Sequence, residues 1–288
     1  MKKLSLVLVL AVLLGIAGCS APQATPEIIA TTKPVYDFTT YLCENTGLST
    51  GLLISEGVSC LHDYSLNVSQ VKMAENAQVM VISGAGLEEF MQDLVDGCDT
   101  VIDSSKGIPL LECAEEHDHD HAHHEEDSHI WLSPSNAKVM AQNICDGLNL
   151  AYPDQSAIFQ QNLAALLDEL DELQNYGEET LSTLTCREMV TFHDGFGYFA
   201  QAFDLTIAAA LEEESGSEAS AKELIGLIQL MQSKNIPSVF TEINGSVSAA
   251  NIICGEIDAG SYALDMGMSS DYFDIMRYNI KTVKEALG

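Results

Sequence analysis

Short β-branched runs alternate with helical patterns on both sides of one long amphipathic stretch. Of all the features of the sequence, this alternation restricts the possible folds most. In the first half, the pattern predicts strands near residues 28–32, 52–54, 79–82 and 100–103, and helices between them such as 69–76 and 87–96. In the second half, it predicts strands near residues 188–192, 205–210, 238–241 and 261–264. Strands that alternate with helices form parallel sheets, so the sequence predicts an α/β fold with one mainly parallel sheet in each half.

The segment from Asp154 to about Thr183 separates the two halves. Its large apolar residues recur at steps of three or four, at Phe159, Leu163, Leu166, Leu170 and Leu173. This is the spacing of an amphipathic helix, and about thirty helical residues would extend roughly 45 Å. Because a small lobe is narrower than that, we expect a stiff helix that crosses both lobes. A second helix is predicted to begin at Ser220, which forms a capping-box pattern with Glu223.

The amino terminus reads as an export signal. Lys2 and Lys3 precede an uncharged apolar run of about fourteen residues that ends at Ala17. A spanning helix needs roughly twenty apolar residues, so a retained transmembrane anchor is the alternative that the length disfavours. Ala17-Gly18-Cys19 resembles the lipobox of bacterial lipoproteins, in which the cysteine becomes the acylated first residue. We therefore expect Cys19 to anchor the mature chain to the extracytoplasmic face of a cell membrane.

These patterns divide the chain into five parts. They are a signal peptide at residues 1–18, a lipidated tether at 19–26, an N-terminal α/β lobe at 27–153, a linker helix at 154–185 and a C-terminal α/β lobe at 186–288.

The chain is strongly acidic, with 43 Asp and Glu against 12 Lys and Arg and a formal charge of −31. This charge repels phosphate backbones and excludes nucleic acid as a partner. An acidic surface also concentrates cations, although it can serve solubility alone. Seven cysteines follow Cys19, an odd number without a C-x-x-C pair, so at least one thiol stays unpaired within a monomer. Small buried side chains are the plain alternative to disulfides for these cysteines.

Residues 115–128 read EEHDHDHAHHEEDS and contain no apolar side chain larger than that of Ala122. Such a segment cannot bury a core, so it predicts a mobile surface loop. Its five histidines are His117, His119, His121, His123 and His124.

The remaining three histidines, His62, His129 and His193, fall in loops at predicted strand or helix ends. Ligands of open parallel sheets gather beyond the carboxyl ends of the strands, and there Glu242 and Asp265, like His193, each follow a predicted strand. Three imidazole nitrogens and one carboxylate oxygen form a tetrahedral set that suits Zn²⁺. A lone histidine is more often structural, and the residues alone leave both interpretations open.

Six stretches resemble, in order, the zinc and manganese receptor family of ABC importers. They are Thr31–Phe38 (TTKPVYDF), His62–Tyr64 (HDY), Gly84–Glu88 (GAGLE), His129–Pro134 (HIWLSP), His193–Tyr198 (HDGFGY) and Ser220–Leu224 (SAKEL). The resemblance covers nearly the whole mature chain. It implies two α/β lobes joined by one rigid helix, with metal held in the cleft between them by His62, His129, His193 and Asp265. It also implies that the histidine-acid segment is an accessory metal loop.

The function implied by the resemblance is that of a lipid-anchored receptor, expected to be a monomer, which captures Zn²⁺ and delivers it to an ABC permease and its ATPase. Zinc is favoured over Mn²⁺ because manganese-preferring relatives tend to carry a carboxylate at the position of His193, and imidazole suits zinc. A manganese receptor of the same family and a surface metal-binding adhesin remain alternatives. A zinc hydrolase is the rival enzyme class, but the chain has no H-E-x-x-H motif, so we expect no catalytic residues.

The chain departs from the family pattern at two places. Ser59-Cys60-Leu61 replaces a proline-rich approach to His62, and Ile243-Asn244-Gly245 follows Glu242 where the family usually has Pro-Gln-Phe. Cys60 is therefore a candidate additional ligand, since a thiolate binds zinc well. We expect Glu242 to contact a metal ligand without binding the metal, or to be structural. Trp131 and Pro134 are expected to orient His129.

Overall fold

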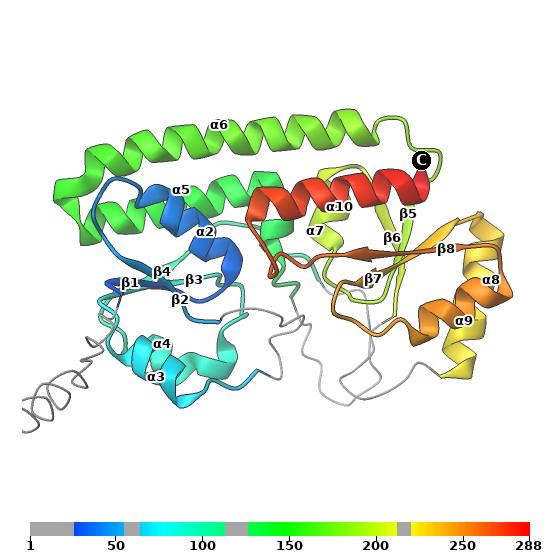
Figure 1. Cartoon of the computed structure of the whole chain (residues 1–288), viewed down its shortest axis with the longest axis horizontal. Helices are drawn as coiled ribbons and strands as arrows, with labels where there is room; N and C mark the ends of the chain where they lie inside the picture. The colour runs from blue at the N-terminus through cyan, green and yellow to red at the C-terminus, as the bar shows by residue number, and fades with distance from the viewer. Residues whose placement is uncertain (1–25, 55–63, 113–125, 212–219) are drawn as a thin grey trace, which may run out of the picture.

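A computed structural model describes residues 26–54, 64–112, 126–211 and 220–288 of the chain. These residues form two α/β lobes, each built on a four-stranded sheet whose strands are all parallel (Figure 1). The predicted fold class, with one parallel sheet in each half of the chain, is confirmed.

The N-terminal sheet has the strand order β2-β1-β3-β4. Its strands are β1 (Ile28–Ala30), β2 (Thr50–Leu52), β3 (Val79–Ile82) and β4 (Val101–Asp103). The helices of this lobe are α2 (Lys33–Leu42), α3 (Val68–Glu75), α4 (Gln92–Gly97) and α5 (Pro134–Ala151), with 3-10 turns η1 (Glu89–Met91) and η2 (Ile130–Leu132). The central strand β1 is wholly buried, as expected for a parallel strand covered on both faces.

The C-terminal sheet repeats this topology in the order β6-β5-β7-β8. Its strands are β5 (Glu188–Thr191), β6 (Thr206–Ala210), β7 (Ser238–Glu242) and β8 (Gly260–Leu264). Its helices are α7 (Gly197–Ala202), α8 (Ala221–Lys234), α9 (Ser248–Glu256) and α10 (Tyr272–Leu287). In each sheet the strand order reverses at one point, between β1 and β3 in the first sheet and between β5 and β7 in the second. Ligands of open α/β sheets bind at such switch points, beyond the carboxyl ends of the strands.

The helix α6 (Ser156–Leu181) joins the lobes and runs along one side of both, with α5 and α10 beneath it (Figure 1). A 3-10 turn, η3 (Pro153–Gln155), leads into it. The predicted long helix is confirmed, and its five predicted apolar positions from Phe159 to Leu173 are all buried. Near its C-terminal end, α6 passes so close to the other lobe that a Cβ atom at Gly177 would lie 2.2 Å from a ring carbon of Phe203.

Helix starts follow from local chemistry. Ser220 and Glu223 form the predicted capping box at the start of α8. Pro134 occupies the first turn of α5, and the Ser133 side chain accepts a hydrogen bond from the Asn136 amide.

The predicted helix over 87–96 is wrong at its start. Gly84, Ala85 and Gly86 have φ values of 80°, 53° and 80°, so the chain turns sharply before any helix can form. The buried Glu88 carboxylate closes this turn by accepting hydrogen bonds from the amides of Ser83 and Gly84. The helical segment therefore starts at Glu89.

The prediction of a mobile loop over 115–128 is wrong at its C-terminal end. Asp127 and Ser128 are buried, and Glu126 pairs with Glu112 in an isolated antiparallel bridge. The Asp127 amide, carbonyl and carboxylate are hydrogen-bonded within the folded chain, which compositional reasoning cannot foresee. Residues 115–125, with all five of the clustered histidines, lie outside the described residues.

The lobes contact each other directly as well as through α6. The Trp131 indole donates a hydrogen bond to the Met266 carbonyl over 2.8 Å, and the Tyr272 hydroxyl donates to the Trp131 carbonyl over 2.9 Å. One hydrophobic core runs continuously from Ile28 to Leu287, and a smaller core lies around β7, α8 and α9. The five described cysteines are Cys43, Cys98, Cys145, Cys186 and Cys254, all free thiols. Within the described ranges, no helix is both long enough and apolar enough to cross a membrane.

Candidate metal site

His129 of the N-terminal lobe and His193 of the C-terminal lobe face each other. Their Nε2 atoms lie 3.3 Å apart, and the two rings are perpendicular with centroids 5.0 Å apart. His193 follows the buried residue Phe192 at the carboxyl end of β5, whereas His129 immediately precedes η2. The His129 residue is 8% exposed, so the pair is largely shielded from water. Two of the histidines singled out in the sequence are thus brought together at the junction of the lobes.

A carboxylate lies beside the Nδ1 atom of each ring, on the side away from the facing Nε2 atoms. Nδ1 of His129 lies 2.8 Å from Oδ1 of Asp127, and Nδ1 of His193 lies 3.1 Å from Oε1 of Glu242. Glu242 is the last residue of β7, which pairs with β5 at the switch point of the C-terminal sheet. A carboxylate beside Nδ1 favours the proton on that nitrogen and leaves the lone pair on Nε2. This is the protonation state in which imidazole binds a metal.

A metal ion placed between the two Nε2 atoms would accept a lone pair from each of them, while each Nδ1 atom keeps its carboxylate partner. Two nitrogens bonded to zinc at 2.0–2.1 Å with a tetrahedral angle lie about 3.3–3.4 Å apart, which matches the separation of His129 and His193.

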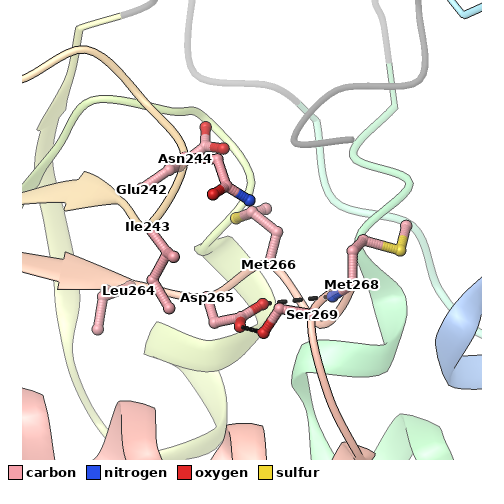
Figure 2. A pocket seen from close by; sticks show the side chains of 8 residues that line it. All are labelled: Glu242, Ile243, Asn244, Leu264, Asp265, Met266, Met268 and Ser269. Atoms are coloured by element: carbon pink, nitrogen blue, oxygen red, sulfur yellow. Dashed lines mark hydrogen bonds between the residues drawn. The ribbon is translucent and has the colours of Figure 1, made fainter. Parts of the chain in front are cut away.

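Asp265 follows β8 and lines a small pocket to which Glu242 also contributes (Figure 2). The pocket is lined by the ends of β7 and β8 and the turns after them: Glu242, Ile243, Asn244, Leu264, Asp265, Met266, Met268 and Ser269. The Asp265 carboxylate accepts hydrogen bonds from the Gly267 amide at 2.8 Å, the Met268 amide at 3.3 Å and the Ser269 hydroxyl. It therefore closes its own turn in this structure.

Asn279 of α10 fixes the backbone of Asp265. The Asn279 side chain accepts from the Asp265 amide at 2.9 Å and donates to the Asp265 carbonyl at 2.8 Å. Asn279 is fully buried, so both hydrogen bonds are shielded from water. The carboxylate of Asp265 is thus presented from a rigid base.

The other candidates have different outcomes. Among the described residues, no three His, Cys, Asp or Glu side chains gather closely enough to hold a metal ion, so Asp265 does not complete a set with His129 and His193 here. His62, Cys60 and Cys19 lie outside the described residues. The Trp131 ring meets His129 edge-on, with centroids 5.3 Å apart.

Asp127 is the residue that sequence reasoning missed. It was absorbed into the acidic segment 115–128, although its carboxylate also accepts a hydrogen bond from the His129 amide at 2.9 Å. The available signal was its position two residues before His129, where a short carboxylate readily closes a local turn.

Comparisons with known proteins identify the family of the chain. The family model for ZnuA, described as zinc-uptake complex component A, periplasmic, matches residues 28–286. The zinc-binding lipoprotein AdcA of Streptococcus pneumoniae is 30% identical over 307 residues, a match that covers 99% of this chain and 61% of AdcA. The chain thus spans less than two thirds of the length of this curated relative.

Two solved structures share the fold over nearly their whole length. A crystal structure of ZnuA has a TM-score of 0.80 and 29% identity, covering 91% of this chain and 100% of that one. The Zn(II)-bound ZnuA-like domain of S. pneumoniae AdcA has a TM-score of 0.77 and 27% identity, covering 92% and 99%. Because the family model matches almost the entire length described, the chain belongs to the ZnuA family of periplasmic zinc-uptake components.

Proposed function

We propose that this protein is an extracytoplasmic receptor that captures Zn²⁺ between its two lobes and delivers it to an ABC permease for import. The facing Nε2 atoms of His129 and His193, each ring backed by a carboxylate, carry this proposal. The family description, which names a zinc-uptake complex, and the name of AdcA as a zinc-binding lipoprotein support it.

The proposed ligands are His62, His129, His193 and Asp265. His129 and His193 supply two corners of a tetrahedron in their present positions, and His62 would supply the third imidazole. Asp265 would supply the carboxylate oxygen, which requires its side chain to exchange a hydrogen bond within its turn for the metal. Glu242 and Asp127 do not bind the metal in this proposal. Each carboxylate orients one imidazole ring, because it lies beside the Nδ1 atom of that ring.

The nitrogen-rich set favours zinc over manganese. Imidazole suits zinc, whereas manganese prefers oxygen ligands and lies lowest in the Irving–Williams series. A manganese receptor with the same fold is the competing function, and metal competition decides between them. We propose no catalytic residues.

The remaining parts of the proposal concern location and delivery. Cys19 would carry the lipid that anchors the mature chain to the outer side of the membrane, with the signal peptide at 1–18 and the tether at 19–26. The five histidines between His117 and His124 would collect metal weakly, without forming the transport site. The receptor would act as a monomer on a permease powered by an ATPase. The lobes would span 27–153 and 186–288, with 154–185 as the linker.

Growth on limiting metal tests the transport function. A strain without this gene is expected to grow poorly when zinc is scarce and to recover on added zinc, but not on added manganese. A purely adhesive protein would leave growth unchanged. Cys19→Ala tests the anchor, because the variant should lose acyl labelling and leave the membrane fraction; unchanged labelling would refute the anchor alone.

A further inference from the structure

Tyr198 of α7 reaches from the C-terminal lobe into the chain that leads to His129. Its hydroxyl accepts a hydrogen bond from the Leu111 amide at 2.9 Å and donates one to the Asp127 carbonyl at 3.0 Å. Leu111 and Asp127 are themselves joined, since the Asp127 amide donates to the Leu111 carbonyl at 2.8 Å. Tyr198 is 1% exposed, so these contacts are shielded from water. One phenol thus closes a buried junction of three residues.

This junction continues to the metal site through a single side chain. Oδ1 of Asp127 accepts from both the amide and Nδ1 of His129. The contacts therefore run from Tyr198 through Asp127 to the ring whose Nε2 faces His193. Tyr198 and His193 are only five residues apart at the end of β5 and the start of α7. The C-terminal lobe therefore carries His193 and also, through Tyr198, contacts the residue that hydrogen-bonds His129.

We propose that Tyr198 is a positioning residue for zinc: it fixes Asp127 so that Asp127 keeps the His129 ring at the angle and in the tautomer that zinc requires. This inference rests on the proposed zinc-binding function. It differs from a packing role, in which Tyr198 would stabilise the lobe junction without affecting the geometry of His129.

The expected size of the effect follows from its place in the chain of contacts. Changing a group that hydrogen-bonds a metal ligand typically costs 10–100-fold in metal affinity. Tyr198 acts one contact farther away, so we expect Tyr198→Phe to weaken zinc binding by about tenfold or somewhat less. The phenylalanine keeps the ring and removes the hydrogen bonds of the hydroxyl with Leu111 and Asp127.

A double-mutant cycle with Asp127→Asn separates positioning from packing. The full chain is prepared as wild type, Tyr198→Phe, Asp127→Asn and the double variant, and zinc affinity is measured by competition with a chelator. If Tyr198 acts through Asp127, its effect on affinity is expected to disappear in the Asp127→Asn background. Thermal unfolding of the metal-free proteins, measured in parallel, reports any general loss of stability.

Tyr272→Phe is the matched control. Tyr272 is also 1% exposed, and its hydroxyl also donates to a backbone carbonyl across the lobes, at 2.9 Å from Trp131. Any effect of Tyr272→Phe on affinity is expected to be equal in both backgrounds. If Tyr198→Phe does not fold, 3,5-difluorotyrosine at position 198 replaces it, because fluorination keeps the hydroxyl but alters both hydrogen bonds.

A Tyr198 variant that binds zinc like the wild type, or whose loss is the same with Asp127 and with Asn at that position, would overturn the inference. Failure of the proposed function looks different, since the wild-type protein itself would then bind no zinc tightly. A wild type that binds zinc, an Asp127→Asn variant that binds it weakly and no coupling to Tyr198 would reject this inference alone.

Discussion

The Nε2 atoms of His129 and His193 lie 3.3 Å apart, although the residues are 64 positions apart in the chain and belong to different lobes. On the opposite side of each ring, Nδ1 of His129 contacts the Asp127 carboxylate and Nδ1 of His193 contacts the Glu242 carboxylate. In the proposed site these two rings would supply half of a tetrahedral ligand set with little reorganisation on binding. The two carboxylates would also compensate the positive charge of the bound cation.

Glu242→Gln should weaken zinc binding by about tenfold, because the neutral amide is a weaker acceptor from Nδ1 of His193 and no longer raises the basicity of the ring. Competition with a chelator measures this. Glu188→Gln is the control, since Glu188 lies at the opposite end of β5 and forms an ion pair with Lys234. Equal affinities of the two variants would contradict the role given to Glu242.

Replacing residues 113–125 by Asn-Gly should leave one tight zinc site. The bridge between Glu112 and Glu126 is antiparallel, and Asn-Gly suits a two-residue turn between such strands. Leu111 and Asp127 would keep their hydrogen bond and their contact with Tyr198. Calorimetry of both proteins should show the weak sites lost and the tight site retained. Loss of tight binding in a folded variant would show that the removed segment supplies a ligand of the transport site.

The fold was largely predictable because its periodicities are strong. The apolar positions of α6 recur at helical spacing, and short β-branched runs mark the strands. The start of the η1 segment was not predictable from periodicity, because the positive φ values of Gly84, Ala85 and Gly86 and the buried Glu88 impose a turn there. Such a turn depends on tertiary hydrogen bonds rather than on local preference.

The site was predictable only in part. The places of His129 and His193 at element ends followed from the sequence, but their contact depends on how the lobes are joined. Asp127 was hidden because the composition of its neighbours predicted a uniform mobile segment. Tyr198 looks like a core aromatic in sequence, and its role depends on where its hydroxyl lies in the folded chain.

Glu88 should make stability depend on pH. Burial raises its pKa from the ordinary 4.5 to about 7, although hydrogen bonds from Thr31, Ser83 and Gly84 oppose this shift. The folded state therefore holds the proton more tightly than the unfolded state. The stabilisation is complete below about pH 4.5 and is lost as the pH rises through 7, at up to about 1.4 kcal/mol per pH unit.

Urea unfolding of metal-free wild type and Glu88→Gln across this range measures the effect. The difference in unfolding free energy, wild type minus variant, should fall between pH 4.5 and 7 and level off above it. A difference that does not change with pH would show that Glu88 does not titrate in this range.

Gly177→Ala should destabilise the protein by up to about 2 kcal/mol. Alanine favours a helix by about 1 kcal/mol over glycine, but its Cβ would lie 2.2 Å from a ring carbon of Phe203, and overpacking of this kind costs about 1–3 kcal/mol. Gly226→Ala in α8 is the matched control. Nothing lies within 4 Å of its Cβ position, so it should stabilise by up to about 1 kcal/mol. Stabilisation by both substitutions in urea unfolding would contradict the close packing of α6 on the C-terminal lobe.

The most direct test of the zinc site is a competition titration of the chain in which Asn-Gly replaces residues 113–125. The protein should bind one equivalent of zinc and prefer it strongly to manganese. Zinc binding should be weakened by each of four substitutions: His62→Ala, His129→Ala, His193→Ala and Asp265→Ala. The loss of zinc affinity in the His129 and His193 variants should exceed the factor of about 10–100 that is expected when a supporting carboxylate is changed. Manganese bound as tightly as zinc, or zinc affinity unchanged by His193→Ala, would contradict the account.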